Sequence, residues 1–284
     1  MAGPIRLDQA LQSAAQKLRA VSENPYLDAQ VLLSHVLNRE RSWLLAYPEV
    51  QLDERAIQEF DRLVARAAEG EALPYLIGER WFYGRSFSVE PAVLIPRPET
   101  ELLVETALDY LRANPDRRRA VDIGTGSGCI AVTLCAEAPD LQMVAIDRSH
   151  QAVRIARRNA ETHGVEHLVN FMMGDLLNAI SGAFDLICAN LPYIPSDRLS
   201  SLEVAKREPH IALDGGGEGL IFISRLLQDA GRCLAPGGCL ILEIDESQGD
   251  RVIELMKRLH PDWPAAVHKD LAGLDRVLVV EREA

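Results

Sequence analysis

The chain has 284 residues, and its net charge of −12 argues against a large nucleic-acid footprint, because such binding needs Lys and Arg to neutralise phosphates. Its apolar residues are dispersed, with no run that could span a membrane and no basic-then-apolar leader, so we expect a cytoplasmic protein with no membrane partner. The five cysteines have no CxxC spacing, which predicts neither a metal site nor disulfides.

Residues 1–76 contain helical patterns and no alternating, strand-like stretch. We expect helices over residues 7–21, 26–37 and 53–68, the last with its apolar side chains at helical spacing. No polar cluster in this region resembles a catalytic site. These residues are therefore predicted to form an N-terminal helical domain that recognises the substrate.

A short connector is predicted over residues 77–97. Two aromatic runs around Gly84 are typical of a β-hairpin between residues 79 and 89. The segment Ile-Pro-Arg-Pro-Glu-Thr-Glu follows at residues 95–101, and its two prolines stiffen the entry to a helix that should run to about Leu111.

The third part, residues 98–284, alternates strands and helices from Ala120 onward, which predicts a mostly parallel sheet covered on both faces. Its first strand runs into a glycine loop and then a helix. The spacing is GxGxG rather than the dinucleotide fingerprint or the phosphate loop. Backbone N–H groups at such a helix start suit a carboxylate, such as an amino-acid tail. The loop residues are Gly124, Thr125, Gly126, Ser127 and Gly128.

Acidic residues follow the next two predicted strands. Asp147 ends the second strand, at the position from which a carboxylate can accept both hydroxyls of a ribose. Asp175 ends the third, where it can accept from an adenine amine while Leu176 lies against the ring. Alone, Asp147 could also help to cap the following helix, with Ser149 as N-cap. Together, a nucleoside site beside an amino-acid site outlines S-adenosylmethionine.

The fourth predicted strand is followed directly by Asn190, Leu191, Pro192 and Tyr193. Because Pro192 biases Leu191 toward an extended backbone, the Leu191 carbonyl can point the same way as the Asn190 side-chain oxygen. Two neighbouring hydrogen-bond acceptors, with Tyr193 as a flat face, suit a planar NH2 group, and we call this arrangement the clamp. The group it binds could be a carboxamide or the exocyclic amine of a base, although the segment alone could also be an ordinary turn.

A loop of about twenty-five residues is expected after this tetrapeptide, with a glycine cluster at residues 215–219. These glycines would permit a mobile flap over the site, or a plain turn before a helix. His210 is interpreted as structural rather than as a general base. The remaining predicted elements are a helix over 220–233, a strand over 239–244, a helix over 248–259 and a strand over 276–280.

The sequence resembles the protein-(glutamine-N5) methyltransferases that modify class-I peptide chain release factors. The resemblance runs from about residue 75 to the end and is carried by residues 78–82, 93–105, 122–128, 190–193, 208–213, 269–273 and 275–276. It implies a class I S-adenosylmethionine-dependent methyltransferase fold, α/β and Rossmann-like, with a seven-stranded sheet containing one antiparallel strand. It also implies transfer to the GGQ glutamine of a release factor, which the N-terminal bundle helps to hold, with S-adenosylhomocysteine as product.

Two positions depart from the family pattern. The family usually has Asn-Pro-Pro-Tyr, but Leu191 keeps the main-chain acceptor, so activity should survive. Residues 243–249 also differ from the usual Glu-Ile-Gly start.

Other functions remain open at this stage. A glutamine methyltransferase acting on a ribosomal protein would share most of these segments, and an adenine-N6 nucleic-acid methyltransferase would use the same clamp but would need a basic face. A nicotinamide-dependent oxidoreductase would need GxGxxG, and a non-catalytic nucleotide-binding module would not need the tetrapeptide.

Overall fold

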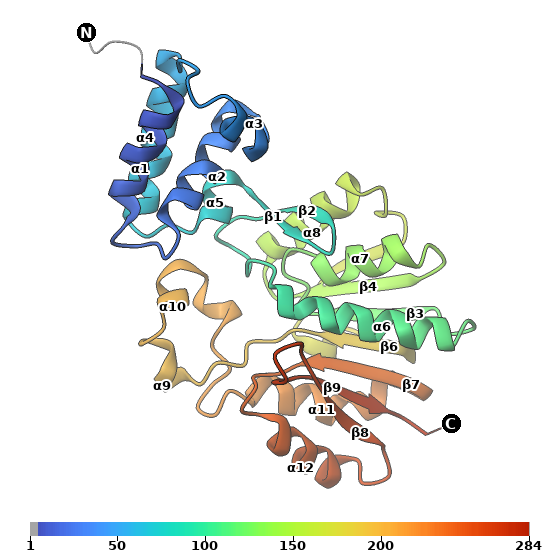
Figure 1. Cartoon of the computed structure of the whole chain (residues 1–284). Helices are drawn as coiled ribbons and strands as arrows, with labels where there is room; N and C mark the ends of the chain where they lie inside the picture. Colours follow the sequence, from blue (N-terminus) through green and yellow to red (C-terminus); the bar gives the residue numbers. More distant parts are fainter. Residues whose placement is uncertain (1–4, 284) are drawn as a thin grey trace. The chain divides into compact units, whose positions relative to one another are not determined.

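The computed structural model describes residues 5–283, and the chain divides between Glu79 and Arg80 into two compact units (Figure 1). In the first unit the three predicted helices are confirmed, with small differences at their ends. Two short helices, α3 and α5, were not predicted. The unit contains α1 (Leu7–Leu18), α2 (Pro25–Leu37), α3 (Arg41–Ala46), α4 (Glu54–Ala68) and α5 (Leu73–Ile77).

Local sequence explains why the helices of this unit begin where they do. The Asp53 carboxylate caps α4 by accepting from the Ala56 backbone N–H at 2.7 Å. The apolar stripe of α4, including Phe60 and Val64, is then buried against α1 and α2. By contrast, α3 spans only six residues, which is too short for a helical repeat to be recognised.

The second unit begins with the hairpin predicted from the sequence, now β1 (Glu79–Phe82) and β2 (Arg85–Ser88). The division of the chain falls within β1, so the hairpin belongs mainly to this larger unit. The three-part division at residues 76 and 97 remains a prediction. A 3-10 turn (Pro98–Thr100) then leads into α6 (Glu101–Ala113), as the two prolines suggested.

A seven-stranded sheet forms the centre of the larger unit, in the order β5-β4-β3-β6-β7-β9-β8. Its neighbours are parallel except where β9 pairs antiparallel with both β7 and β8, which confirms the expected sheet. The strands are β3 (Arg119–Ile123), β4 (Gln142–Asp147), β5 (Val169–Met173), β6 (Phe184–Ala189), β7 (Leu234–Glu243), β8 (Ala265–Lys269) and β9 (Asp275–Glu281).

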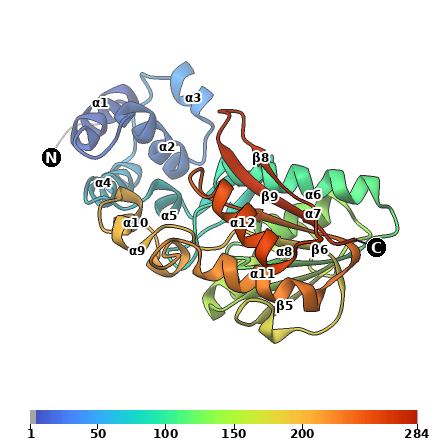
Figure 2. The same cartoon turned by 90° about the horizontal axis from the view of Figure 1, so that it is seen from below.

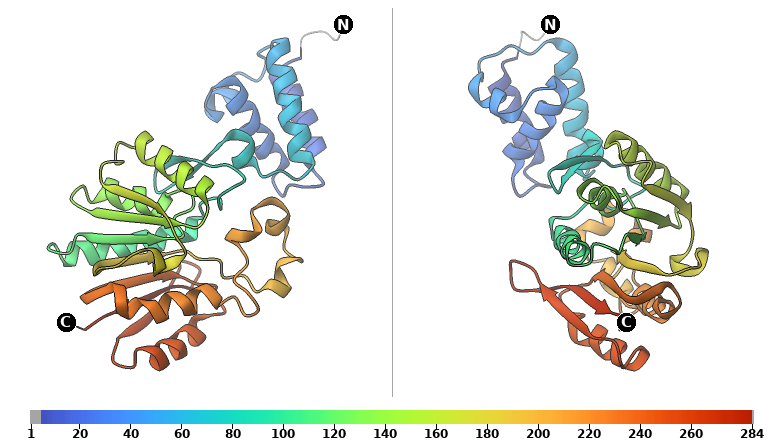
Figure 3. Two further views of the ribbon diagram at one scale, coloured as in Figure 1. Left: turned by 180° about the vertical axis from the view of Figure 1, so that it is seen from behind. Right: turned by 90° about the vertical axis from the view of Figure 1, so that its right-hand side faces the viewer.

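Helices cover both faces of this sheet, and alternate strand residues supply two separate cores (Figures 2 and 3). Ala120 packs toward α6 and α7 (Cys129–Glu137), while its neighbour Val121 packs toward α11 (Ile221–Cys233) and α12 (Gly249–Leu259). This alternation is the period-two pattern expected of strands buried on both sides.

The carboxyl ends of the central strands meet at one edge of the sheet. Ile123 at the end of β3 is in register with Ile146 of β4 and with Ala189 of β6. The chain runs outward from β3 to β4 and β5 on one side, whereas β6 lies on the other, so the strand order reverses at β3. Such a switch point is where open α/β sheets bind their ligands.

The segment after the tetrapeptide corrects the expectation of a long loop. It contains α9 (Ser196–Leu199), α10 (Glu203–Arg207) and a 3-10 turn (His210–Ala212). Leu199, Ala205 and Leu213 are buried in a small apolar cluster. The helices were missed because each has only three to five residues, too few for a repeat to be seen.

Candidate active site

The glycine loop uses backbone conformations that other residues rarely adopt. Gly124, Gly126 and Gly128 have φ values of 75°, 55° and 82°. A Cβ on Gly128 would also lie 2.9 Å from the Cβ of Ala156 in α8 (His150–Thr162). Glycine at this position therefore lets α7 begin tightly against α8, with its first N–H groups at the edge of the sheet.

Buried polar side chains brace this loop from behind. The Thr125 hydroxyl donates to Asp122 at 2.6 Å, and burial raises the pKa of the Asp122 carboxyl to about 7. Asn159, inside α8, donates to the carbonyls of Ser127 at 2.8 Å and of Ser88 at 3.0 Å, and accepts from the Ser88 N–H. Sequence reasoning missed Asn159, although an asparagine among the apolar positions of a helix is a usable signal.

Asp147 is held against the glycine loop by both of its oxygens. One accepts from the Gly126 N–H at 2.9 Å and the other from the Ser149 N–H at 2.8 Å. Ser149 is the N-cap of α8 and accepts from the Ala152 N–H, so the capping role considered as an alternative is also present. Burial raises the pKa of Asp147, and the two N–H bonds oppose that rise. Since each oxygen retains a second lone pair, the carboxylate can still accept from a ligand.

Asp175 and Leu176 follow β5 and line the same pocket. The Asp175 carboxylate is exposed and pairs with Arg225 of α11. Leu176 is buried with φ 51°, a left-handed conformation that is uncommon for a leucine and stores strain. The leucine side chain is thereby placed at the pocket rather than in the sheet.

The tetrapeptide after β6 enters the pocket with three of its four residues, Asn190, Leu191 and Pro192. The Asn190 side-chain NH2 donates to the Thr100 hydroxyl at 3.1 Å, so its carbonyl oxygen remains available as an acceptor. Tyr193 is not among the lining residues. It is half-buried, and its hydroxyl donates to Glu243 at 3.3 Å.

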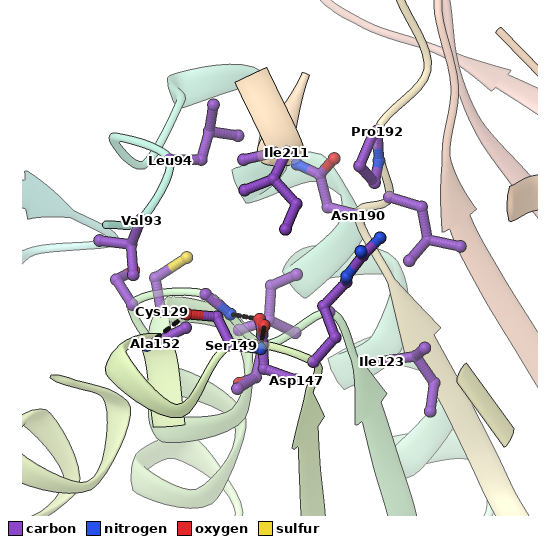
Figure 4. A pocket seen from close by; sticks show the side chains of 18 of the residues that line it. Val93, Leu94, Ile123, Cys129, Asp147, Ser149, Ala152, Asn190, Pro192 and Ile211 are labelled. Atoms are coloured by element: carbon purple, nitrogen blue, oxygen red, sulfur yellow. Dashed lines mark hydrogen bonds between the residues drawn. The ribbon is translucent and has the colours of Figure 1, made fainter. Parts of the chain in front are cut away.

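Figure 4 shows how these side chains surround the pocket. Asp147 and Ser149 lie on one side, with Leu94 and Ile211 on the opposite side and Asn190 beside Ile211. The site thus combines polar groups at three strand ends with an apolar wall.

That apolar wall depends on an ion pair that sequence reasoning did not identify. Glu208 is buried, accepts from the Ile95 N–H at 2.9 Å and pairs with the Arg97 guanidinium. It therefore joins the Arg-Pro-Glu-Thr-Glu segment, which lines the pocket through Arg97 and Thr100, to the Glu-Pro-His segment, which directly precedes the lining residues Ile211 and Ala212. Both segments are among those that carry the family resemblance, but the sequence gives no sign that they pair with each other.

The other polar candidates lie elsewhere. His210 is exposed and is not among the residues lining the pocket. Within residues 5–283, no group of three or more His, Cys, Asp or Glu is placed to hold a metal ion. In the same part of the chain, no helix is both long enough and apolar enough to cross a membrane.

The glycine cluster after α10 lies against the tetrapeptide. A Cβ on Gly215 would lie 2.7 Å from the Pro192 carbonyl oxygen, and one on Gly219 only 2.1 Å from that of Tyr193. Close backbone approach therefore accounts for these two glycines. The predicted motion of a flap remains a prediction.

Comparison with known proteins agrees with this geometry. The family described as PrmC N-terminal domain matches residues 9–78, and the family described as Methyltransferase small domain matches residues 98–260. A methyltransferase from Pyrococcus furiosus has a similar fold, with a TM-score of 0.52 and 18% identity over 78% of this chain and 98% of that protein.

Curated relatives match nearly the whole chain. A release factor glutamine methyltransferase from Nitratidesulfovibrio vulgaris is 42% identical over 97% of this chain and 95% of its own length. Proteins of the same name from Koribacter versatilis and Escherichia coli are 41% and 38% identical, over 96% and 85% of this chain and 97% and 87% of their own lengths. The chain belongs to the release factor glutamine methyltransferase family.

Proposed function

We propose that this protein transfers a methyl group from S-adenosylmethionine to the side-chain amide nitrogen of the GGQ glutamine in class-I peptide chain release factors. The observation that carries the proposal is the orientation of Asn190. Because its NH2 group donates to Thr100, the carbonyl oxygen of this pocket-lining residue is left free, and it is the group needed to accept from a substrate N–H.

The pocket residues fit the cofactor at both of its ends. The N–H groups at the start of α7 suit the carboxylate of its methionine part, and Asp147 retains lone pairs for ribose hydroxyls. Asp175 and Leu176, which line the same pocket, would contact the adenine. S-adenosylmethionine would supply an electrophilic methyl group on its sulfonium sulfur.

The tetrapeptide supplies what a weak nucleophile needs. A carboxamide nitrogen shares its lone pair with its own carbonyl, so it reacts only when it is held in line and its growing positive charge is stabilised. The oxygens of Asn190 and Leu191 would accept the two N–H bonds of the glutamine side chain and meet that charge. Pro192 restricts the Leu191 backbone, while Tyr193, outside the pocket lining, is held by the hydrogen bond from its hydroxyl to Glu243.

The proposal does not require a strong base. The amide proton becomes acidic only as the carbon–nitrogen bond forms, and it can then leave to water or to a neighbouring acceptor. This agrees with a pocket edge where His210 is not among the lining residues.

Two alternatives use the same clamp. An adenine-N6 methyltransferase would also present a planar amine, but the net charge of −12 disfavours nucleic acid. A glutamine methyltransferase for a ribosomal protein would differ in its N-terminal part, and here residues 9–78 match the PrmC N-terminal domain family. Both observations support the release factor as substrate.

The test is methyl transfer from labelled S-adenosylmethionine to a purified release factor whose GGQ glutamine is intact or replaced by glutamate. We expect label on the intact protein only. Label on both forms, or on RNA or DNA instead, would contradict the proposal.

Asn190→Ala tests the clamp itself. We expect it to lower kcat by about 10²–10³-fold, as for the loss of one preorganised hydrogen-bonding group, while the Kd for S-adenosylmethionine changes far less. Asn170→Ala, at an exposed position in β5, is the matched control. Equal losses in kcat and in cofactor affinity for Asn190→Ala would contradict the clamp.

A further inference from the structure

We propose that Gln248 is a positioning residue that holds the tetrapeptide of residues 190–193 in place, so that the clamp meets the substrate amide in line with the methyl donor. Gln248 is the N-cap residue of α12 and lies in the segment 243–249, which departs from the family pattern. It is not among the residues lining the pocket, so it would act through the groups that it contacts. The inference rests on the proposed function, because it concerns how the same site presents its two acceptors.

The Gln248 side chain joins three segments that are separate in the sequence. Its Nε2 donates to the Tyr193 carbonyl at 3.2 Å and to the Gly219 carbonyl at 3.1 Å. Its Oε1 accepts from the Asp245 N–H at 3.0 Å. One side chain therefore connects the end of the tetrapeptide, the end of the glycine cluster before α11 and the turn after β7.

The chemistry of these partners allows only one orientation of the Gln248 amide. The Asp245 N–H can only donate, whereas the two carbonyls can only accept. A flipped amide would place its NH2 against a donor and its oxygen against two acceptors, so all three hydrogen bonds would be lost. Because Gln248 is only 2% exposed, water is not at hand to replace them. The side chain is therefore a rigid link.

The tetrapeptide needs such a link at its far end. Strand β6 ends at Ala189, so pairing with β3 and β7 holds the chain only up to the start of the tetrapeptide. Gln248 holds the other end through the Tyr193 carbonyl. Between these two points, Pro192 restricts the backbone of Leu191. The direction of the Leu191 carbonyl, one of the two acceptors of the clamp, is therefore determined from both sides.

The glycine cluster is joined to the tetrapeptide at the same place. The Ile194 N–H donates to the Leu213 carbonyl at 3.0 Å, and the Gly215 N–H donates to the Ile194 carbonyl at 2.8 Å. Gln248 adds a second connection, because its NH2 group contacts Tyr193 and Gly219 together. The tetrapeptide and the glycine cluster are thus held as one unit against the start of α12.

Helix α11 is held independently of this link. It begins at Ile221, directly after the glycine cluster, and its Phe222 lines the pocket. Ile223 and Leu226 of the same helix are fully buried in the core. Loss of the Gln248 hydrogen bonds should therefore loosen the tetrapeptide without moving the helix that borders the pocket. This separates an effect on kcat from an effect on cofactor binding.

Three variants of the full chain test the inference. Gln248→Met keeps the length of the side chain and removes all three hydrogen bonds. Gln248→Glu keeps the acceptor for the Asp245 N–H but presents an oxygen to both carbonyls. Val252→Ala is the control, because Val252 is fully buried in α12 and its truncation destabilises that helix without touching the Gln248 contacts. Thermal unfolding shows whether each variant is folded at the assay temperature.

We expect both Gln248 variants to lower kcat about 10–100-fold, because the amide nitrogen is no longer held in line. The Kd for S-adenosylmethionine, measured by calorimetry, should stay within about 3-fold, and Val252→Ala should keep the kcat of wild type. In an Asn190→Ala background, Gln248→Met should cost less than about 3-fold, since the clamp that it positions is already incomplete. A purely structural role would give the same fold loss in both backgrounds.

Amide hydrogen exchange tests the link without any methyl transfer. The Ile194 and Gly215 N–H groups should exchange about 10-fold faster in Gln248→Met than in wild type, because the unit they belong to has lost its connection to α12. Val252→Ala should leave their exchange unchanged.

Distinct results overturn distinct claims. Wild-type kcat in Gln248→Glu, equal fold losses in the two backgrounds, or unchanged exchange at Ile194 and Gly215 in Gln248→Met would each refute the positioning role. Failure of the wild type to label any release factor, together with faster exchange in Gln248→Met, would instead refute the proposed function while supporting the link itself.

Discussion

Gly219→Ala should destabilise the larger unit by closing the gap between two backbone segments. The new Cβ would lie 2.1 Å from the Tyr193 carbonyl oxygen and 2.8 Å from the side-chain nitrogen of Gln248. That nitrogen donates to the carbonyls of Tyr193 and Gly219 at 3.2 and 3.1 Å. The methyl group therefore displaces a backbone carbonyl and disturbs one buried and one partly buried hydrogen bond together.

Gly164→Ala provides a matched control. Gly164 has φ 69° and Gly219 has φ 73°, but a Cβ on Gly164 would meet nothing within 4 Å. Both variants pay about 1–2 kcal/mol for an alanine in the left-handed region. Only Gly219→Ala adds overpacking, about 1–3 kcal/mol, and weakened hydrogen bonds of about 1 kcal/mol each. We expect it to lose about 3–5 kcal/mol more than the control.

The assay is urea denaturation of both variants and wild type, with methyl transfer measured in parallel. Gly219→Ala should also reduce kcat, because Tyr193 must move, whereas Gly164→Ala should not. If the two unfolding free energies agree within about 0.5 kcal/mol, the close approach of the two backbones is not what requires glycine at 219.

Three further changes have defined outcomes. Asp147→Asn can accept with only one side-chain oxygen, so we expect the Kd for S-adenosylmethionine to rise about 10-fold by calorimetry, against no change for the exposed Asp140→Asn. Asp122 has a folded-state pKa of about 7 against an ordinary 3.8, so its contribution to the free energy of unfolding is present below about pH 4 and is lost as pH rises through 7. The loss is on the order of 4 kcal/mol. In denaturation series between pH 4.5 and about 7.5, Asp122→Asn should not show this loss of unfolding free energy; wild type and variant with parallel pH profiles would disprove the assignment. Glu208→Ala leaves Arg97 and the Ile95 N–H unpaired and should cost about 3 kcal/mol, while Glu203→Ala, at an exposed position of α10, should stay within about 0.5 kcal/mol.

The sequence could predict those parts of the fold that are determined by patterns among residues close together in the chain. Helical spacing in α4, the aromatic runs of the hairpin and the glycine loop before α7 are all patterns within about fifteen residues. Strand ends carrying Asp147 and Asn190 could be aligned because parallel strands of one sheet end at the same edge.

What sequence could not predict depends on partners far apart in the chain. Glu208 and Arg97 are 111 residues apart, and the separation between Asn190 and Thr100 is 90. Nothing in the neighbourhood of either residue indicates such a pairing, since it is created by the topology of the sheet. Similarly, β8 escaped recognition because it is an edge strand with mostly exposed side chains and little apolar pattern.

Asn159 has a practical consequence for building chimeras from relatives of this protein. Through Ser88 and Ser127, one side chain couples the hairpin to the loop after β3. When N-terminal domains are exchanged, the junction should therefore lie upstream of Glu79, so that the hairpin and Asn159 come from the same protein. A junction downstream of Ser88 would combine Asn159 with a foreign hairpin and remove the native Ser88 backbone to which it is hydrogen-bonded.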